Sequence, residues 1–511
     1  MKRSKFSLSN YKLLTCNMGT LIPCNLMEVL PGDTVQAATS LLLRVTPLVA
    51  PVMHPVRIRI HHWFVPHRLI WEDWEDFITG GPDGMDASAF PVLDPSSAPD
   101  GPADYYGIPQ GYPGPVSALP FRGYNMIWNE FYRDQDLELE RVLSESSGTD
   151  VDTDITTARV CWEKDYFTSA RPWTQKGPDV SLPIGAVAPV RRVALGSAPQ
   201  FYQENNSGGG VTPDQTLKGF EGGSLPVGAG GADASYMYMV DGPNSPAAAQ
   251  PLRWGAATGL EADLASASAV NINELRRAFA LQRYEEARAR YGSRYTEYLR
   301  YLGVKSSDAR LQRPEYLGGG KQTIQFSEVL QTGPDPDATS GEGVANLKGH
   351  GIAAMRSNRF RRFFEEHGYV HSFISVLPRT IYQQGVPRTF NRRFKEDFFQ
   401  RELQHIGQQE VLTKELYAAS ATGDAVWGYQ DRYDEYRRSE SSVHGEFRTI
   451  LDYWHFGRQF ASEPVLNQSF VQADPTDRPF AEKTQNSLWI MCNNSIQARR
   501  QVAASGKSFI F

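Results

Sequence analysis

VRIRIHHWFV, residues 56–65, is the stretch of sequence that decides the fold. Its apolar and polar residues alternate, so that one face of an extended strand carries Val56, Ile58, Ile60 and Phe64, and the other carries Arg57, Arg59 and His61. This alternation predicts a β-strand in a sheet that buries one face and leaves the other polar.

Four further segments with strand-like patterns lie far from this one along the chain. They are residues 35–48, 322–331, 369–382 and 488–500. In residues 369–382 the apolar side chains occupy both alternating faces, which predicts a strand that is covered on both sides. Residues 1–34, which end in the turn Pro31-Gly32-Asp33, are predicted to form an irregular N-terminal arm.

Long insertions separate these strands. Residues 81–120 are dense in Pro and Gly, and residues 196–268 are rich in Gly with an excess of acids. Helices are few: residues 271–290 open with an Asn-x-x-Glu variant of the capping box, and residues 392–405 form a second candidate. Widely separated strands, few helices and oversized loops are typical of a β-sandwich or jelly roll with insertions.

Composition and charge exclude several classes of protein. The 511 residues are 41% hydrophobic and 22% charged, and no apolar run is long enough to cross a membrane. The net charge of −6 disfavours a protein that coats nucleic acid over its whole surface, but is compatible with local basic patches. Four cysteines without metal-ligand spacing predict a reducing compartment, and no apolar stretch follows the basic N-terminus, so we expect no secretory signal.

No catalytic, cofactor or metal motif is complete in this sequence. The acidic run at residues 150–154 lacks the Gly that must follow in a calcium loop, so a solvated acidic loop is the better interpretation. His61 and His62 are adjacent in a predicted strand and point to opposite faces, so they cannot bind one metal ion together. We therefore predict structural histidines, no cofactor and no enzymatic activity.

Two segments, residues 359–364 and 388–395, interleave basic and aromatic residues, the combination that phosphate contacts and base stacking use. The candidate nucleic-acid contacts are Arg359, Arg361, Arg362, Arg388, Arg392, Arg393 and Lys395, with Lys2, Arg3 and Lys5 of the arm as a flexible addition. The alternative is an amphipathic element whose Phe side chains are core and whose Arg side chains are solvated or paired to Glu365, Glu366 and Glu396.

Seven segments spread along the chain resemble the major capsid protein of microviruses, and in particular of the gokushovirus-like branch of these small icosahedral single-stranded-DNA bacteriophages. They read LPGD (30–33), HWFVP (62–66), WEDFITGG (74–81), CWEKDYFTS (161–169), SDARLQRPEYLGG (307–319), EEHGY (365–369) and RTIYQQG (379–385).

The resemblance implies a mainly β fold, an eight-stranded antiparallel jelly roll, in a T=1 icosahedral shell of sixty copies around a circular single-stranded DNA genome. It divides the chain into the arm, residues 1–34, and one jelly-roll capsid domain, residues 35–511, in which the insertion at 196–268 forms a surface protrusion that contacts the host. The basic residues named above become candidates for genome-facing positions.

The resemblance also implies partners and a place of assembly. The partners are an internal scaffolding protein, a small basic DNA-binding protein, a pilot protein, the packaged single-stranded DNA and a host surface receptor. The particle would assemble in the cytoplasm of the host cell, and the chain would be part of the virion.

One alternative function stays open from the residues alone. An intracellular β-sandwich that binds glycans, or a glycosidase, would use the 23 Tyr and 10 Trp residues for sugar stacking. Because paired catalytic carboxylates leave no local motif, the failed motif search does not exclude it.

Overall fold

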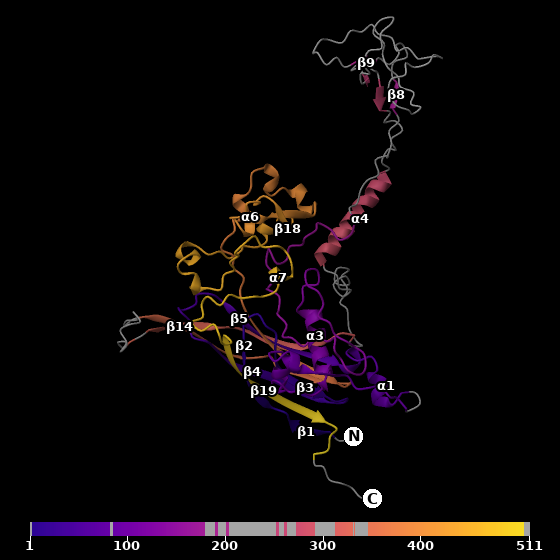
Figure 1. The fold of residues 1–511 in the computed structure, drawn as a ribbon, viewed down its shortest axis with the longest axis vertical. Helices are drawn as coiled ribbons and strands as arrows, with labels where there is room; N and C mark the ends of the chain where they lie inside the picture. Colours follow the sequence, from indigo (N-terminus) through magenta and orange to yellow (C-terminus); the bar gives the residue numbers. More distant parts are fainter. Residues whose placement is uncertain are drawn as a thin grey trace, which may run out of the picture. The chain divides into compact units, whose positions relative to one another are not determined.

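The strand predicted first lies inside a four-stranded antiparallel sheet of the computed structural model (Figure 1). In spatial order, the sheet consists of β12 (Glu315–Thr323), β5 (Val56–Pro66), β16 (Gly368–Pro378) and β3 (Ile22–Val29). Val56, Ile58 and Ile60 of β5 are fully buried, whereas Arg57 and Arg59 between them are partly exposed. The predicted division into a buried and a polar face holds for the first half of β5, up to His61, whereas both faces are buried from His62 to Pro66.

A second, seven-stranded antiparallel sheet brings the two ends of the chain together. Strand β19 pairs with β1 and β2 on one side and with β4 on the other, and β4 also pairs with β14 and β15. The strands are β1 (Ser4–Ser7), β2 (Asn10–Cys16), β4 (Thr34–Val45), β13 (Gln325–Leu330), β14 (Leu347–Arg356), β15 (Phe360–Phe363) and β19 (Leu488–Arg500). The strands predicted at residues 35–48 and 488–500 are thus present.

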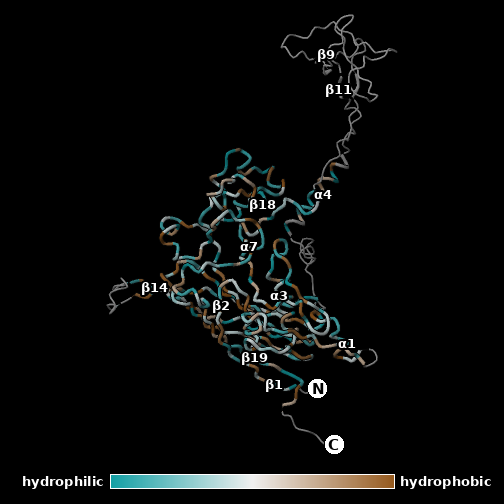
Figure 2. Tube along the Cα trace, in the orientation of Figure 1, coloured by the Kyte–Doolittle hydropathy of each residue, from teal (hydrophilic) through white to brown (hydrophobic). Residues whose placement is uncertain are grey.

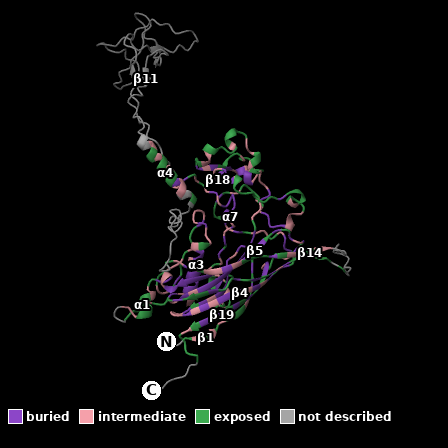
Figure 3. Ribbon diagram, turned by 180° about the vertical axis from the view of Figure 1, so that it is seen from behind, coloured by how far each residue is buried: buried purple, intermediate pink, exposed green. Residues whose placement is uncertain are grey.

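The two sheets pack face to face around a shared apolar core. Leu41 and Leu43 of β4 and Ile490 of β19 lie in one cluster with Ile60 of β5 and Ile374 of β16, and each is at most 4% exposed. Full burial of such a side chain contributes about 1.5–3 kcal/mol. Figure 2 shows apolar segments within the two sheets, and Figure 3 shows buried residues along β4 and β19.

The other side of the four-stranded sheet is covered as well. Trp63 of β5 and Phe373 of β16 pack there with Tyr124 of α3 (Leu119–Phe131). Strand β16 is therefore buried on both sides, as its apolar residues predicted. The helix approaches β16 closely at Gly123, where a Cβ atom would lie 2.7 Å from Nε2 of His371.

Residues 1–34 are not the irregular segment that the sequence predicted. Strands β1 and β2 pair with β19, and β3 pairs with β16, so most of this stretch belongs to the two sheets. Only the turn at its end is as expected, where Asp33 accepts a hydrogen bond from the backbone of Leu30 and forms an ion pair with Arg500. The first two strands are short and polar, and pairing with β19 stabilises them more than their own propensity does.

The helix predicted at residues 392–405 is wrong. Two short 3-10 helices lie there instead, η5 (Lys395–Asp397) and η6 (Arg401–His405), and a third, η4 (Arg388–Phe390), precedes them. The Asp397 carboxylate accepts hydrogen bonds from the backbone N–H groups of Arg393 and Phe394, at 2.8 and 2.9 Å. Such local side-chain bonds satisfy backbone donors outside a helix and so compete with helix formation.

Two further predictions need correction in detail. The strand predicted at residues 322–331 is divided at Ile324, because β12 and β13 belong to different sheets. Residues 81–120 are not only extended loop, since they contain α2 (Pro102–Tyr106) and the paired strands β6 (Val92–Leu93) and β7 (Val116–Ser117).

The remaining elements of this part of the chain are short. They are α1 (Trp74–Thr79), α6 (Thr413–Leu416), α7 (Gln468–Val471), β17 (Gln408–Leu412), β18 (Val426–Asp431), η1 (His67–Leu69), η2 (Pro95–Ser97), η7 (Asp434–Tyr436), η8 (Gly445–Arg448) and η9 (Asp452–Trp454). Strands β17 and β18 pair with each other, outside the two large sheets.

The structure describes residues 3–81, 85–178, 190–192, 201–203, 252–254, 260–262, 272–291, 312–330, 332 and 346–504. The chain divides into two units, residues 178–282 and the remainder. The smaller unit contains most of α4 (Ile272–Tyr291), which confirms the predicted helix, and the paired strands β8 (Val190–Arg192) with β11 (Leu260–Ala262) and β9 (Phe201–Gln203) with β10 (Leu252–Trp254).

Most of the predicted insertion at 196–268 lies outside the described residues. Among the helices that are described, none combines the length and apolarity needed to span a membrane.

Candidate genome-facing surface

The aromatic residues of the first basic segment, residues 359–364, have divided roles. Phe360 and Phe364 are 7% and 1% exposed and pack in the core with Phe64 and Val35, so neither can stack on a nucleic-acid base. Phe363, on the opposite face of β15, is 44% exposed. Core packing, which was the alternative interpretation, therefore accounts for two of these three phenylalanines.

The three arginines of this segment are exposed, but they are not equivalent. Arg362 forms a 3.1 Å ion pair with Glu315 at the edge of the other sheet. Arg361 alternates with it and points to the side of the seven-stranded sheet that faces away from the core. Arg359 precedes the strand.

In the second segment, residues 388–395, two arginines hold buried carboxylates. Arg388 donates to Oε1 of Glu415 at 2.8 Å, and Arg392 donates to Oε1 of Glu435 at 3.3 Å and lies over the ring of Tyr436. Burial raises the pKa of Glu415, and the Arg388 charge acts against that rise. These two arginines lie in ion pairs within the subunit.

The other members of the second segment lie at the surface. Phe394 is 68% exposed, and Arg393 beside it is exposed as well. Lys395 is also exposed, and its only ion pair among the described residues is a long one, 3.6 Å, with Glu396.

The basic residues of the N-terminal arm join the seven-stranded sheet. Lys5 lies in β1 opposite Arg499 of β19, and both are exposed. The guanidinium of Arg3 lies 5.1 Å from the centre of the Phe363 ring. Lys2 lies outside the described residues.

Arg3, Lys5 and Arg361 therefore meet at what we call the open face, the side of the seven-stranded sheet turned away from the core. Strand register and the alternation of burial place the following residues on it: Lys5, Ser7, Tyr11, Leu13, Thr15, Thr34, Gln36, Ala38, Ser40, Leu42, Arg44, Gln325, Ser327, Val329, Lys348, His350, Ile352, Ala354, Arg356, Arg361, Phe363, Trp489, Met491, Asn493, Ser495, Gln497 and Arg499.

No residue of the open face is acidic, although Asp and Glu make up 58 of the 511 residues. Sequence reasoning missed Arg44, Arg356 and Arg499, because each stands alone in its own strand and is not part of a basic run. The signal that identifies them is the alternation of buried and exposed residues along β4, β14 and β19, combined with the pairing of these strands.

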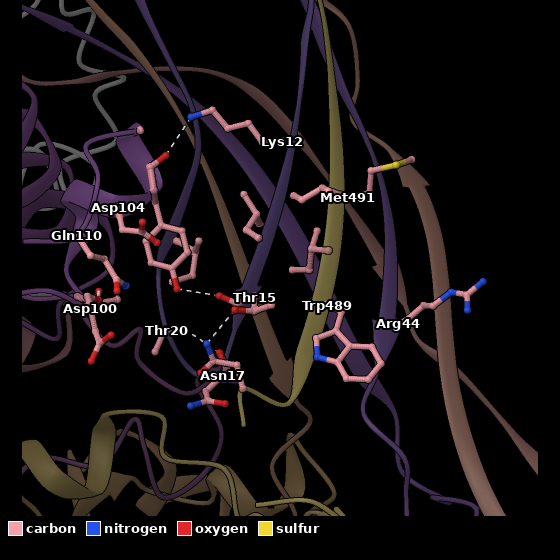
Figure 4. Close-up of a pocket in the computed structure, with 18 of the residues that line it drawn as sticks. Lys12, Thr15, Asn17, Thr20, Arg44, Asp100, Asp104, Gln110, Trp489 and Met491 are labelled. Carbon is pink, nitrogen blue, oxygen red and sulfur yellow. Dashed lines mark hydrogen bonds between the residues drawn. The ribbon is translucent and has the colours of Figure 1, made fainter. Parts of the chain in front are cut away.

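A groove of about 980 Å³ lies at the β2 end of this sheet (Figure 4). Trp489 and Arg44, which are neighbours across β19 and β4, line one part of it. Asp100 and Asp104 line another part, across β2 in the figure. The groove thus combines an aromatic side chain with charges of both signs.

No metal centre is formed by the predicted residues. Both ring nitrogens of His62 are hydrogen-bonded to serine hydroxyls, at 2.8 and 3.0 Å, while His61 contacts the Tyr132 hydroxyl on the other face, as expected for structural histidines. Across the part of the chain that the structure describes, no group of three His, Cys, Asp or Glu side chains is placed to hold a metal ion.

The acidic run at residues 150–154 is not the solvated loop that we expected. Asp150 is buried and accepts a 2.8 Å hydrogen bond from Nε of Arg122, and both side chains are fully shielded from solvent. Asp154 forms an ion pair with Arg141. The run therefore stabilises the chain around α3.

Comparison with known proteins decides what kind of protein carries this β-sandwich. The sequence model of the capsid protein (F protein) family matches residues 1–508. The chain belongs to this capsid protein family. The predicted resemblance to the microvirus major capsid protein is confirmed.

Three relatives are similar over nearly the whole chain, and each is named capsid protein VP1. That of Bdellovibrio phage phiMH2K is 36% identical over 494 residues, which cover 93% of this chain and 89% of the relative. That of Chlamydia phage 1 is 34% identical, with 95% and 92% covered, and that of Spiroplasma virus 4 is 31% identical, with 95% and 90% covered.

The chain is accordingly a structural capsid protein and a component of the virion, and it is not an enzyme. The mainly β structure of antiparallel sheets and few helices, seen in the described residues, fits a capsid β-sandwich. The alternative of a glycan-binding protein or glycosidase is set aside by this membership.

Proposed function

We propose that sixty copies of this chain assemble into a closed T=1 icosahedral shell around a circular single-stranded DNA genome. The observation that carries the proposal is the family match across residues 1–508, which includes the strands of both sheets. Within the sandwich, eight strands form the jelly roll of the capsid domain at residues 35–511. Residues 1–34, although paired into the sheets, act as the arm that extends this domain.

An exposed apolar segment supports assembly with further copies. In the single subunit, large hydrophobic side chains of residues 390–406 are between 52% and 80% exposed: Phe390, Phe394, Phe398, Phe399 and Ile406. Several large apolar side chains exposed within one short segment are typical of an interaction site. In a closed shell each copy buries surface against several neighbours, and this segment is covered by an adjacent copy.

The charge balance supports a separate internal partner. Each chain carries −6, so a shell of these chains does not neutralise a genome by its bulk charge. A small basic DNA-binding protein supplies most of the counter-charge, and local basic surfaces of the shell add to it. An internal scaffolding protein guides assembly in the host cytoplasm. A pilot protein is the third proposed partner inside the particle.

The insertion at residues 196–268 is proposed to form a protrusion on the outside of the particle, where it contacts a host surface receptor. Its glycine content and acidic bias suit solvent better than a nucleic-acid cavity. Brief proteolysis of intact particles should cut within this insertion first and leave the shell closed. Protection of the insertion, with cuts elsewhere, would contradict its external position.

Assembly itself is tested by co-expressing the chain with the scaffolding protein of its own virus. Sedimentation and negative-stain electron microscopy should then show uniform closed particles. The proposal fails if the chain never sediments faster than a small oligomer under these conditions.

A further inference from the structure

We propose that the open face of the seven-stranded sheet is a binding surface for single-stranded DNA, on which arginines and lysines contact phosphates and aromatic side chains stack on bases. The inference rests on the proposed function in one respect only: the DNA-filled shell supplies the strand that this face binds in the particle. The surface itself follows from the pairing register of the seven strands.

The charge of the open face is of one sign. Lys5, Arg44, Arg356, Arg361 and Arg499 are all exposed there, and none forms an ion pair with any described residue. The chain as a whole has a net charge of −6, but the open face carries basic residues and no carboxylate, so its local charge is positive. Such a face attracts a polyanion and repels a small basic protein.

Aromatic side chains stand among these cations. Tyr11, Phe363 and Trp489 are 74%, 44% and 41% exposed on the open face. The solvent-exposed face of an antiparallel sheet normally carries polar residues. Exposed aromatic rings on such a face therefore indicate a ligand with flat apolar surfaces. Unpaired nucleobases have such surfaces, and stacking on an aromatic side chain tolerates any sequence.

The dimensions of the face suit a strand of several nucleotides. Trp489 and Arg499 lie ten residues apart on β19, about 34 Å along an extended strand. Asp100 and Asp104 line the groove beside β2, where Trp489 and Arg44 also lie. The phosphates therefore contact the other end, around Arg361 and Arg499, while Trp489 stacks on a base near the groove.

Only some of the basic residues predicted from the sequence to contact DNA lie on the open face. Arg3, Lys5 and Arg361 belong to the DNA surface. Arg362, Arg388 and Arg392 are in ion pairs within the subunit, and Arg359, Arg393 and Lys395 lie outside the open face. The phosphate contacts thus come mainly from arginines in separate strands and not from the basic runs.

The charge test uses the full-length chain and a fluorescent oligo-dT of about 30 nucleotides, with binding measured by anisotropy at several salt concentrations. The variant replaces Arg356, Arg361 and Arg499 by Gln. Each phosphate contact on a single strand contributes about −0.7 to the slope of log K against log salt, so the slope should flatten by about 2. When the salt concentration rises from about 50 to about 200 mM, the fold-loss of affinity should be about 18 times larger for the wild type than for the variant.

The matched control removes three arginines that are also exposed but lie elsewhere, on α4, as R276Q, R277Q and R283Q. It changes the net charge by the same amount, so a bulk-charge effect would alter both variants alike. Unchanged binding by the open-face variant, or equal losses in the two variants, would overturn the proposal. Failure of the wild type to bind the oligonucleotide would overturn it as well.

The stacking test compares Trp489→Ala with Phe279→Ala, which changes an exposed aromatic residue outside the open face. Loss of one stacked base should weaken oligo-dT binding about 5- to 150-fold for the first variant and leave it unchanged for the second. An abasic oligonucleotide of the same length should bind wild type and Trp489→Ala equally. A loss with the abasic strand would show that Trp489 supports the sheet and stacks on no base.

Assembly is measured separately on the same variants. If closed particles form but the open-face variant retains as much DNA as the control variant, the DNA surface is wrong and the proposed function stands. If the wild type forms no particles, the proposed function fails, whereas the binding measurements on the full-length chain still decide the DNA surface.

Discussion

Replacing His62 by Gln should remove part of the sandwich's sensitivity to acid. The ring of His62 is buried, and its two nitrogens are hydrogen-bonded to the hydroxyl groups of Ser372 and Ser357. Burial, with a smaller effect of the neighbouring His61 charge, lowers the pKa of His62 from 6.5 to about 4. In the folded chain this imidazole therefore stays neutral at a pH where the unfolded chain protonates it.

The sign and size of the effect follow from linkage. Between pH 6.5 and pH 4 the unfolded state binds more protons at His62 than the folded state, so the free energy of unfolding falls as the pH falls. Lowering the pKa of His62 from 6.5 to about 4 is worth about 3.4 kcal/mol of folding free energy, of which about 2 kcal/mol is already lost at pH 5.

The substitution isolates this contribution from the rest of the molecule. Four other histidines, three of them buried and His61 partly exposed, have a lowered pKa and act in the same direction: His54, His61, His67 and His371. Carboxyls whose pKa burial raises act in the opposite direction: Glu138, Glu415, Asp434 and Glu440. These groups are common to wild type and variant, so their contributions cancel in the difference.

The assay is urea unfolding of wild type and His62→Gln at pH 7.5 and pH 5, followed by tryptophan fluorescence. Whatever the variant costs at pH 7.5, that cost should be about 2 kcal/mol smaller at pH 5. His444→Gln, at an exposed position, serves as the control and should show the same difference from wild type at both pH values. A pH-independent difference for His62→Gln would refute the reasoning.

Three further changes test the packing. Asp150→Asn leaves Arg122 buried without its counter-charge and should lower the free energy of unfolding by about 3–5 kcal/mol; a loss below about 1 kcal/mol would contradict the fully shielded pair. Gly123→Ala forces α3 away from His371 and should cost about 1–3 kcal/mol in urea unfolding, whereas no cost would mean that the helix approaches β16 less closely. Deleting residues 1–16 removes β1 and β2, so β19 becomes an open edge, and light scattering should detect aggregation that an independent arm would not cause.

The parts of the fold that the sequence predicted are those whose pattern is local. Strand β5 alternates between apolar and polar residues from Val56 to His61, so the two faces of this part of the strand can be assigned from its own sequence. This is not possible for strands β1 and β2, because they are held by β19, whose residues lie nearly five hundred positions further along the chain. The helix expected at residues 392–405 failed for another local reason, the hydrogen bonds that Asp397 accepts from nearby backbone.

The candidate surface was predicted only in part, for a related reason. Basic runs are visible in a sequence, and one of them contains Arg361. Arg44, Arg356 and Arg499 become neighbours only through the register of β4, β14 and β19, which no single segment encodes. The ion pair of Arg388 with Glu415 likewise depends on a contact between separate segments.

An icosahedral reconstruction of DNA-filled particles by electron cryomicroscopy tests the central claim most directly. We expect sixty copies of the chain, with the open face turned toward the lumen and nucleic-acid density against Arg356, Arg361 and Arg499. A reconstruction in which this face lies on the outside of the particle, or is buried between copies without DNA, would contradict it.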